Sequence, residues 1–457
     1  SGTSGTPTGS VTLSSGTYNS GAVTLVGGSA RITIAAGKLA TGTVTLTASY
    51  NSSEPSTYNN ASGTGSLTVT APMLITPTVT VTPNPASITM AIVPAQSILY
   101  VCQGSLGPGG SDALTITSLF ASSGPGVQIE LSGQNCTANS TIVWGSQQSL
   151  NIGSAALTCN LSAGPCTANT SYLTPTTYSF TCALIAGSNS ATCPSANFSA
   201  ANDLNESFYC QDALASTVDL HTSIAVVNSS TSITLADPVG STITSGDFSC
   251  QETIRDQGWG LFANGGSIVN ANAGGSGLYL QELILKSCNN CVVSGVDFVN
   301  PAGGRNWHTM IADVSNFTAD GNTFISGLGY GQDGLHIFGP YQNVGVTNTT
   351  LDTGDDGIVL DGGEFFGSGT ILNINGAGHG ALIDNTQGSD GSRCIAIYSL
   401  CINASGSCVA NLQSDIYIDG VTGLPGTQDG TQGCVQAVAV GVPNTASPAI
   451  NDVTIKN

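Results

Sequence analysis

The sequence predicts an all-β protein that ends in a right-handed parallel β-helix. Only 7% of its 457 residues are charged, whereas 40% are hydrophobic and recur in short strand-like runs. Thr and Val favour strands, and Gly and Asn favour turns. In the second half of the chain, similar segments repeat every 26 or 27 residues, at Gly295, Gly321, Asn348 and Asn375. Repetition at this interval without helical periodicity is typical of a β-solenoid.

The charge and hydropathy of the chain exclude several partners. The net charge is −20, and the chain contains seven Lys and Arg residues. Nucleic acids and anionic membranes are bound through clustered basic side chains, so neither is expected as a partner. No apolar run reaches the ~18 residues of a membrane span, so membrane insertion is not expected. The chain opens on SGTSGTPTGS without a signal peptide, as expected of a mature or trimmed product.

The cysteines predict an oxidising, extracellular compartment. Residues 1–101 contain no Cys, and all fourteen lie between Cys102 and Cys434. Structural disulfides are the favoured interpretation. Cys288 and Cys291 form a CxxC motif, but a thioredoxin-like βαβ context is lacking, so a redox role is weakly indicated. Glycosylation sequons agree with a surface glycoprotein, for example at Asn135, Asn139, Asn316 and Asn348.

Residues 1–72 are predicted to form a β-sandwich module. Five alternating runs follow one another at intervals of about ten residues, with turn residues between them. The frame TPTGSVTLSSG…TYNNASGTGSLTVTA resembles the bacterial Ig-like repeats of large surface proteins, which implies a spacer. Repeats of that family open with a segment like TPTVTVTPNPASIT, which here occupies residues 76–89. The chain is therefore expected to begin inside a longer array.

The rest of the chain is predicted to form two further domains. Residues 73–200 contain six cysteines and strand-like runs such as ALTITSLF and GVQIEL, which indicates a Cys-rich β domain whose role stays open. Residues 201–457 are predicted to form the parallel β-helix, with short strands such as CVVSGVDFVN (291–300) and FTADGNTFIS (317–326). The LxxLxL frame of a leucine-rich repeat is absent.

Three acidic residues and a histidine stand out on this repeat. Asp333 opens DGLHIFG, Asp355 and Asp356 lie in TGDDGIVLDGG, and His379 lies in GAGHGALI. The separations 333 to 356 and 356 to 379 are both 23 residues. Equal spacing in a solenoid stacks residues on one face, so a cleft with an acid cluster and a histidine is predicted. Glycines on both sides of the Asp pair permit the bend that lets both carboxyls share this cleft.

These motifs, GQDG (331–334), GDDG (354–357) and GHG (378–380), resemble those of polygalacturonase-type glycosidases, glycoside hydrolase family 28, in order and in spacing. The resemblance implies a pectin lyase-like β-helix and an inverting glycosidase acting on an extracellular polysaccharide. It implies that Asp355 is the general acid, that Asp333 and Asp356 activate water, and that His379 supports the acid or binds substrate. It requires no cofactor and no metal ion.

The resemblance identifies the residues that would bind the substrate less clearly than the catalytic residues. The family's basic motif, which grips a substrate carboxylate, is expected near residue 412, where the sequence reads ANLQSDIYIDG. A neutral or differently charged polysaccharide therefore becomes more plausible. Trp307 is either a core residue or a platform for a sugar ring. The remaining candidates for contact with the substrate are His308, His336, Arg305 and Arg393.

Other functions stay open at this point. A structural or adhesive fibre subunit is one, because INDVTIKN ends the chain like a solenoid coil without a polar cap, and an uncapped coil can stack on another copy. A non-catalytic carbohydrate-binding module is another. The acid cluster itself admits two further interpretations, a calcium site and carboxylates that cap backbone amides at solenoid turns.

Overall fold

A computed structural model describes residues 6–32, 34, 38–39, 42–69, 78–79, 88–89, 96–133, 135–161, 164–215, 218–271, 281–301, 307–326, 332–363, 372, 374–390, 393–399, 411–423, 436–441 and 450–457. The chain divides into two compact units. The first comprises Ser1–Ile75 and Val93–Ile98, and the second comprises Thr76–Ile92 and Leu99–Asn457.

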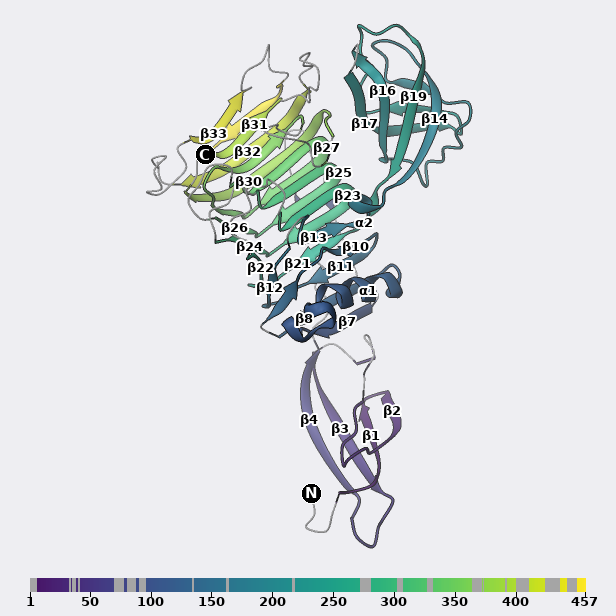
Figure 1. Cartoon of the computed structure of the whole chain (residues 1–457), viewed down its shortest axis with the longest axis vertical. Coiled ribbons are helices and arrows are strands. Elements are labelled where there is room, and N and C mark those ends of the chain that lie inside the picture. Colours follow the sequence, from purple (N-terminus) through teal and green to yellow (C-terminus); the bar gives the residue numbers. More distant parts are fainter. Residues whose placement is uncertain are drawn as a thin grey trace. The chain divides into compact units, whose positions relative to one another are not determined.

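The first unit contains a four-stranded antiparallel sheet in the order β2-β1-β3-β4 (Figure 1). Its strands are β1 (Gly9–Ser15), β2 (Tyr18–Thr24), β3 (Gly42–Ser52) and β4 (Ala61–Val69). Among its described residues no second sheet packs on this one, and no side chain of residues 6–67 is buried. These residues therefore show a single sheet, and the predicted Ig-like sandwich stays a prediction.

The second unit is built around one long sheet of parallel strands, as predicted for a β-helix (Figure 1). Five long strands stack in succession, namely β23 (Leu283–Ser294), β25 (Thr309–Asp320), β27 (Leu335–Thr347), β30 (Gly378–Asp390) and β32 (Gln413–Gly423). Each pairs with the next in parallel register, for example Phe317 with Val344 and Val344 with Ala381. Ile311, Phe317 and Ile337 are among the fully buried side chains of this stack.

Shorter strands complete the coils. Before residue 200 they are β7 (Gln96–Val101), β8 (Val127–Ser132), β9 (Cys136–Ala138), β10 (Ile142–Trp144), β11 (Gln148–Asn151), β12 (Ala156–Cys159) and β13 (Thr167–Asn169). After it they are β20 (Asp256–Gln257), β21 (Gly260–Phe262), β22 (Ser267–Asn270), β24 (Asp297–Asn300), β26 (Thr323–Ser326), β28 (Thr350–Asp352), β29 (Asp356–Asp361), β31 (Arg393–Tyr398), β33 (Gln436–Gly441) and β34 (Val453–Lys456). A separate two-stranded sheet contains β5 (Thr78–Val79) and β6 (Ile88–Thr89).

The repeat seen in the sequence corresponds to a column of left-handed turn residues. The pairing of β23, β25, β27, β30 and β32 aligns the residues that follow Ser294, Asp320, Thr347, Asp384 and Asp419. These residues are Gly295, Gly321, Asn348, Asn385 and Gly420, with φ angles of 68°, 64°, 52°, 50° and 64°. Only Gly and Asn adopt this conformation readily. The fourth member is thus Asn385, whereas the predicted Asn375 makes an isolated bridge with Gly363.

Helix α1 (Ala113–Ser123) packs against β8 and β10, the first coils of the stack. Its Phe120 stacks on Trp144, and Trp144 stacks on Trp259, with ring centroids 5.5 and 4.5 Å apart. The buried Asp112 just before the helix accepts hydrogen bonds from four donors, which are Tyr100 Oη and the backbone N–H groups of Gln103, Gly104 and Thr137. Short helical turns lie at Gly104–Leu106 (η1), Pro108–Gly110 (η2) and Thr170–Leu173 (α2).

A closed antiparallel barrel interrupts the coils between α2 and β20 (Figure 1). Its strands are β14 (Thr176–Leu184), β15 (Ser190–Thr192), β16 (Ser207–Ala215), β17 (Val218–Ser229), β18 (Ser232–Leu235) and β19 (Gly246–Ile254). Phe208, Ile224 and Leu235 are buried in its core.

The structure therefore differs from the predicted division of residues 73–457. The boundary expected between residues 200 and 201 falls inside the barrel, between β15 and β16, and parallel coils lie on both sides of the barrel. The strand pairing keeps the 26- to 27-residue interval only from β23 to β27, and the steps to β30 and β32 are 37 and 35 residues. The barrel separates β13 from β20 in the sequence, although the two remain in one sheet.

Disulfides are present, as predicted. The described residues show five of them, joining Cys102 to Cys136, Cys159 to Cys166, Cys182 to Cys193, Cys210 to Cys250, and Cys288 to Cys291. Two of the five lie in the barrel. No helix within the described ranges combines the length and the apolar character needed to cross a membrane.

Candidate active site

Asp333 and Asp356 occupy paired positions on adjacent coils. Leu335 on β27 pairs with Ile358 on β29, which aligns each residue of one coil with the residue 23 positions later. The backbone N–H of Asp356 donates a hydrogen bond to Asp333 Oδ1 at 3.0 Å. The spacing of 23 residues noted in the sequence therefore brings these two acids together.

The next coil adds a basic residue and a phenol. Asp356 pairs with Arg393 on β31, and the Nε of Arg393 donates to Asp356 Oδ1. Arg393 Nη2 lies 3.5 Å from Asp355 Oδ1, so one guanidinium contacts both neighbouring carboxylates. Tyr398 Oη donates to Asp356 Oδ2 at 3.2 Å. We refer to Asp333, Asp355, Asp356, Arg393 and Tyr398 as the acid cluster.

Burial sets the electrostatics of the acid cluster. Asp333 and Asp356 are both 5% exposed. Burial, reinforced by the charge of Asp355, raises the pKa of Asp333 well above its usual range. Burial and the charge of Asp333 raise the pKa of Asp356 to about 7, against the opposing effect of Arg393. The side chains of Asp355 and Arg393 are 16% and 30% exposed, so the cluster reaches solvent through these two residues.

His336 and Trp307 lie beside the acid cluster. His336 Nε2 is 2.7 Å from Asp333 Oδ2, and burial lowers the pKa of His336 to about 4, so the ring is neutral near neutral pH. The Trp307 ring stacks on His336 with centroids 4.1 Å apart and planes inclined by 23°. Trp307 is half-buried and also packs against the apolar cluster that contains Phe338 and Met310. It therefore supports the site from its apolar side.

His308 is placed behind the site. It is 0% exposed, its Nε2 lies 2.8 Å from Ser326 Oγ, and its Nδ1 lies 3.4 Å from Glu282 Oε2. A side chain without solvent access is poorly placed to contact a glycan directly. Arg305, the other predicted substrate-binding residue of this stretch, lies outside the described residues.

His379 does not follow the predicted stacking. Asp356 pairs with Arg393, which lies 37 residues later in the sequence and not 23. The interval is longer because β29 ends at Asp361 and β30 begins only at Gly378. His379 instead pairs with Gln342 on the far half of β27. Its Nδ1 lies 2.8 Å from Ser414 Oγ, and its Nε2 lies 2.7 Å from Asp237 Oδ1 in the barrel segment. These contacts tie His379 to the barrel and not to the acid cluster.

Two residues of this arrangement, Tyr398 and Asp237, are not predicted by the sequence. Tyr398 ends the run CIAIY, whose apolar alternation matches GIVLD 37 residues earlier, and that match was the available signal. Asp237 had none, because its contact with His379 spans 142 residues and two different architectures. Within the described ranges, no group of three or more His, Cys, Asp or Glu side chains is arranged to hold a metal ion.

Comparison with known proteins adds little to this geometry. No protein-family profile and no curated protein matches the sequence. Solved structures that the chain resembles include the tailspike gp61 of Pseudomonas phage phi297, with 12% identity, a TM-score of 0.33 and coverage of 77% of this chain and 69% of that chain. Another is the tailspike gp54 of Acinetobacter baumannii bacteriophage AP22, in complex with A. baumannii capsular saccharide, with 10% identity, a TM-score of 0.23 and coverage of 76% and 74%.

A third is PfbA, a surface adhesin of Streptococcus pneumoniae, with 9% identity, a TM-score of 0.29 and coverage of 76% of this chain and 79% of that chain. Likenesses at these TM-scores establish neither the fold nor the function of the present chain. Its parallel β-helix and its acid cluster rest on its own strand pairing and side-chain contacts.

Proposed function

We propose that this chain is an extracellular glycan-processing protein whose acid cluster hydrolyses glycosidic bonds. The observation that carries the proposal is the contrast between two neighbouring carboxyls joined by Arg393. Asp356 is buried and has a pKa of about 7, whereas Asp355 is partly exposed. Hydrolysis of a glycosidic bond requires one carboxyl that holds a proton and one that is ionised, and different environments separate the two roles.

The burial pattern favours roles that differ from those implied by the family resemblance. Asp356 is the better proton donor, because a carboxyl with a pKa of about 7 still carries its proton near neutral pH. Asp355 is the better candidate for the base, because its side chain is 16% exposed and can reach a water molecule. Asp333 raises the pKa of Asp356 through its charge and fixes the backbone of Asp356 through a hydrogen bond.

The substrate we propose is a neutral polysaccharide. Arg393, expected as a substrate-binding residue, is engaged with Asp355 and Asp356. A guanidinium that already contacts two carboxylates is a poor partner for a third one on a uronic acid. Trp307, which is half-buried and stacks on His336 beside the cluster, offers a ring face for sugar.

The test is release of reducing ends from a panel of neutral and acidic polysaccharides by the full chain. We expect product from at least one neutral glycan, and we expect Asp356→Asn and Asp355→Asn each to lower the rate about 10²- to 10⁴-fold. Asp352→Asn, at the end of β28, serves as the control and should keep the rate. Proton NMR of the first product should show inversion at the anomeric carbon. A panel on which the unaltered chain releases nothing overturns the proposal.

A structural or adhesive role is the second candidate, and one observation favours it. Asp333 and Asp356 are shielded from solvent and hydrogen-bonded within the cluster, which also suits a network that stabilises the coils. In that role the first sheet, residues 1–72, is an Ig-like spacer, and the chain assembles with copies of itself. Sedimentation at rising protein concentration tests self-assembly, and a persistent monomer that cleaves glycan excludes this candidate as the main function.

A further inference from the structure

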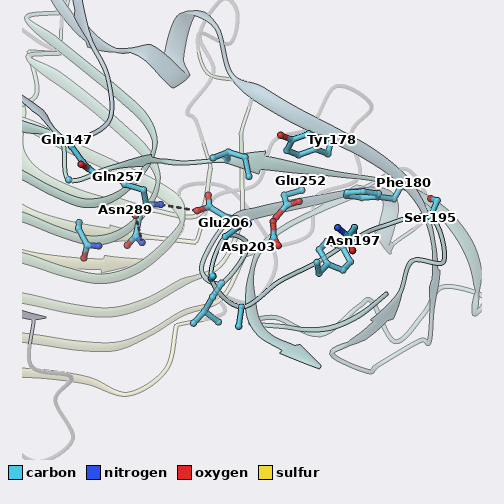
Figure 2. Close-up of a pocket in the computed structure, with 18 residues that line it drawn as sticks. Gln147, Tyr178, Phe180, Ser195, Asn197, Asp203, Glu206, Glu252, Gln257 and Asn289 are labelled. Carbon is cyan, nitrogen blue, oxygen red and sulfur yellow. Dashed lines mark hydrogen bonds between the residues drawn. The ribbon is translucent and has the colours of Figure 1, made fainter. Parts of the chain in front are cut away.

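A pocket of about 1270 Å³ opens at one end of the barrel, where the barrel meets the coils (Figure 2). One wall comes from β14, β19 and the segment from Ser195 to Glu206. The other comes from coil turns that carry Gln147, Gln257 and Asn289. Mouths of β-barrels are common ligand sites. The volume exceeds the ~300–1,000 Å³ typical of drug-sized ligands, which suits an oligomer better than a single ring.

Glu252 has one carboxyl oxygen that is left without a hydrogen-bond partner in the pocket wall. It lies on β19 directly opposite Tyr178 of β14 and Phe208 of β16. Glu252 is 2% exposed, and its Oε1 has no hydrogen-bond partner among the described residues. Figure 2 shows its side chain beside Asp203 in the pocket wall. A buried acceptor without a partner is costly, so a ligand hydroxyl that donates to Oε1 would be strongly favoured.

Neighbouring acids are held in place by the wall itself. Glu206 accepts hydrogen bonds from Gln257 Nε2 at 2.9 Å and from the backbone N–H of Arg255. Asp203 accepts one from the backbone N–H of Ser199. Burial, with the nearby charge of Asp203, raises the pKa of Glu252 to about 8, so its carboxyl is mostly neutral near neutral pH. The pocket is therefore poised for neutral hydrogen-bonding groups.

Aromatic rings complete the chemistry of the pocket. Tyr178 is 51% exposed at the rim, and Phe180 lies two residues along the same strand. Phe180 packs edge-on against Phe198 with ring centroids 5.3 Å apart. Side-chain amides of Gln147, Asn197 and Asn289 face the same space. The described lining residues combine rings with many neutral donors and acceptors and include no Lys or Arg, which matches the apolar faces and hydroxyl edges of sugars.

We infer that the barrel mouth is a binding site for a neutral oligosaccharide, with Tyr178 stacking on a sugar ring and Glu252 accepting a hydroxyl. No residue of the acid cluster lines this pocket, so the inference goes beyond the proposed hydrolysis and holds with or without it. The other acidic side chains of the lining, Asp203 and Glu206, offer no positive charge to an anionic glycan. The neutral state of Glu252 removes the ion pair that an amino sugar would need there.

The test is isothermal titration calorimetry on the full chain carrying Asp356→Asn, so that the probes are not cleaved. The neutral probes are cellohexaose, maltohexaose and laminarihexaose, and the charged comparators are hexagalacturonate and the chitosan hexamer. At least one neutral hexasaccharide should bind more tightly than both comparators. Adding Tyr178→Ala should weaken that binding about fivefold or more. Ile185→Ala, which removes an exposed side chain just after β14, should leave it unchanged.

Two substitutions of Glu252 distinguish a contact with the ligand from a purely structural role. Glu252→Gln keeps an uncharged oxygen acceptor and should bind within about twofold of the parent, whereas Glu252→Leu should abolish binding. No binding of any neutral probe, tighter binding of a charged comparator, or full binding by Tyr178→Ala overturns the inference. Cleavage by the unaltered chain without binding at the barrel mouth would overturn the inferred binding site but not the proposed hydrolysis. Binding at the barrel mouth by a chain that cleaves no glycan would support this site and overturn the proposed hydrolysis.

Discussion

His379 on the coil stack and Asp237 in the barrel segment are joined by a contact of 2.7 Å between Nε2 and Oδ1. Asp237 is held in turn by Thr222, whose hydroxyl donates to Asp237 Oδ2 at 2.7 Å. A second joint lies at Arg255, which pairs with Asp313 on β25 and donates from Nη2 to Ser223 on β17 at 3.1 Å. A histidine expected in a catalytic cleft thus fastens an inserted barrel to the coils.

This contact predicts a pH-dependent contribution to stability. Burial opposes protonation of His379, but the hydrogen bond and charge of Asp237 outweigh it and raise the pKa. A raised histidine pKa stabilises the fold below the unfolded value of about 6.5, and this gain is lost as pH rises through the folded pKa. Asp237→Asn should therefore lower the free energy of unfolding by about 1 kcal/mol more at pH ~5.5 than at pH ~9. Urea denaturation measures both values, with the exposed Asp247→Asn as control, and an equal loss at both pH values contradicts the prediction.

Substitution of Asp356 is predicted to raise the free energy of unfolding, whereas substitution of Asp237 is predicted to lower it. Its folded pKa of about 7 exceeds the unfolded value, so the folded state takes up a proton that the unfolded state releases. The contribution of Asp356 to stability is therefore present at low pH and lost as pH rises from about 4 to about 7. Asp356→Asn should be stabilising relative to the unaltered chain at pH ~8, on the order of 3 kcal/mol more than at pH ~4. Denaturation curves at the two pH values measure this difference, and a variant whose stability relative to the unaltered chain is the same at both pH values contradicts the prediction.

The same carboxyl predicts the alkaline limb of any hydrolytic activity. If Asp356 donates the proton, the rate of glycan hydrolysis should fall about tenfold per pH unit above pH ~7, because the donor ionises. Arg393→Lys keeps a positive charge but not the planar fork that contacts two carboxylates, and it should shift this limb. A pH–rate profile on the best substrate measures both. A rate that stays constant to pH ~9 removes Asp356 from the role of donor.

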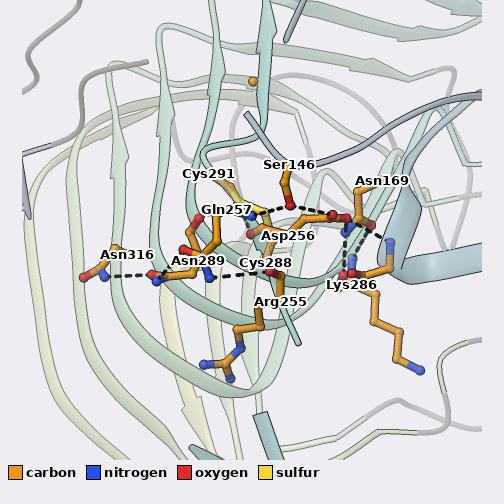
Figure 3. The surroundings of a disulfide bond; sticks show 12 residues. Ser146, Asn169, Arg255, Asp256, Gln257, Lys286, Cys288, Asn289, Cys291 and Asn316 are labelled. Atoms are coloured by element: carbon orange, nitrogen blue, oxygen red, sulfur yellow. Dashed lines mark hydrogen bonds between the residues drawn. A yellow bond between two sulfur atoms is a disulfide. The ribbon is translucent and has the colours of Figure 1, made fainter. Parts of the chain in front are cut away.

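An amide ladder along the coils predicts unequal effects of small substitutions. Asn316 donates to Asn289 Oδ1 at 2.9 Å, and Asn289 donates to Gln257 at 3.0 Å (Figure 3). Asn316 also accepts from Asn343 Nδ2 at 3.2 Å. The φ of Asn316 is 52°. Asn316→Ala loses both bonds and strains the turn, at about 2–3 kcal/mol, whereas Asn316→Gly avoids the strain and should cost about 1 kcal/mol less. Urea denaturation compares them, and an Ala variant as stable as the Gly variant is the contrary result.

The barrel disulfides predict a graded loss of stability. Cys210–Cys250 closes a loop of 40 residues, and Cys182–Cys193 closes one of 11. Loop entropy gives about 4 kcal/mol for the first and about 3 kcal/mol for the second. Because all four cysteines are buried in one core, replacing either pair by Ala removes similar packing. Denaturation of the two double variants, followed by barrel tyrosine fluorescence, should show the larger loss for the 210–250 pair; the reverse order would contradict the entropic account.

The amino-acid sequence by itself determined the repeating part of this protein. Gly295, Gly321 and Asn348 marked a column of turns because each needs a left-handed backbone that few residues adopt. The 23-residue interval between Asp333 and Asp356 placed them on adjacent coils, because the strand ladder carries a local spacing directly into the stack. The apolar runs after residue 290 and the cysteines likewise indicated parallel coils and disulfides, whereas the run ALTITSLF, predicted to be strand-like, forms helix α1.

Only the tertiary structure decided what surrounds those acids. The strand register places Arg393, and not His379, beside Asp356. Tyr398 also contacts Asp356. The barrel enters between β13 and β20 without disturbing their shared sheet. Both outcomes have one physical cause: backbone hydrogen bonds fix which strands stack, but a connection of any length can leave and rejoin that ladder. Side-chain partners from distant segments, such as Asp237 for His379, therefore leave no trace in local sequence spacing.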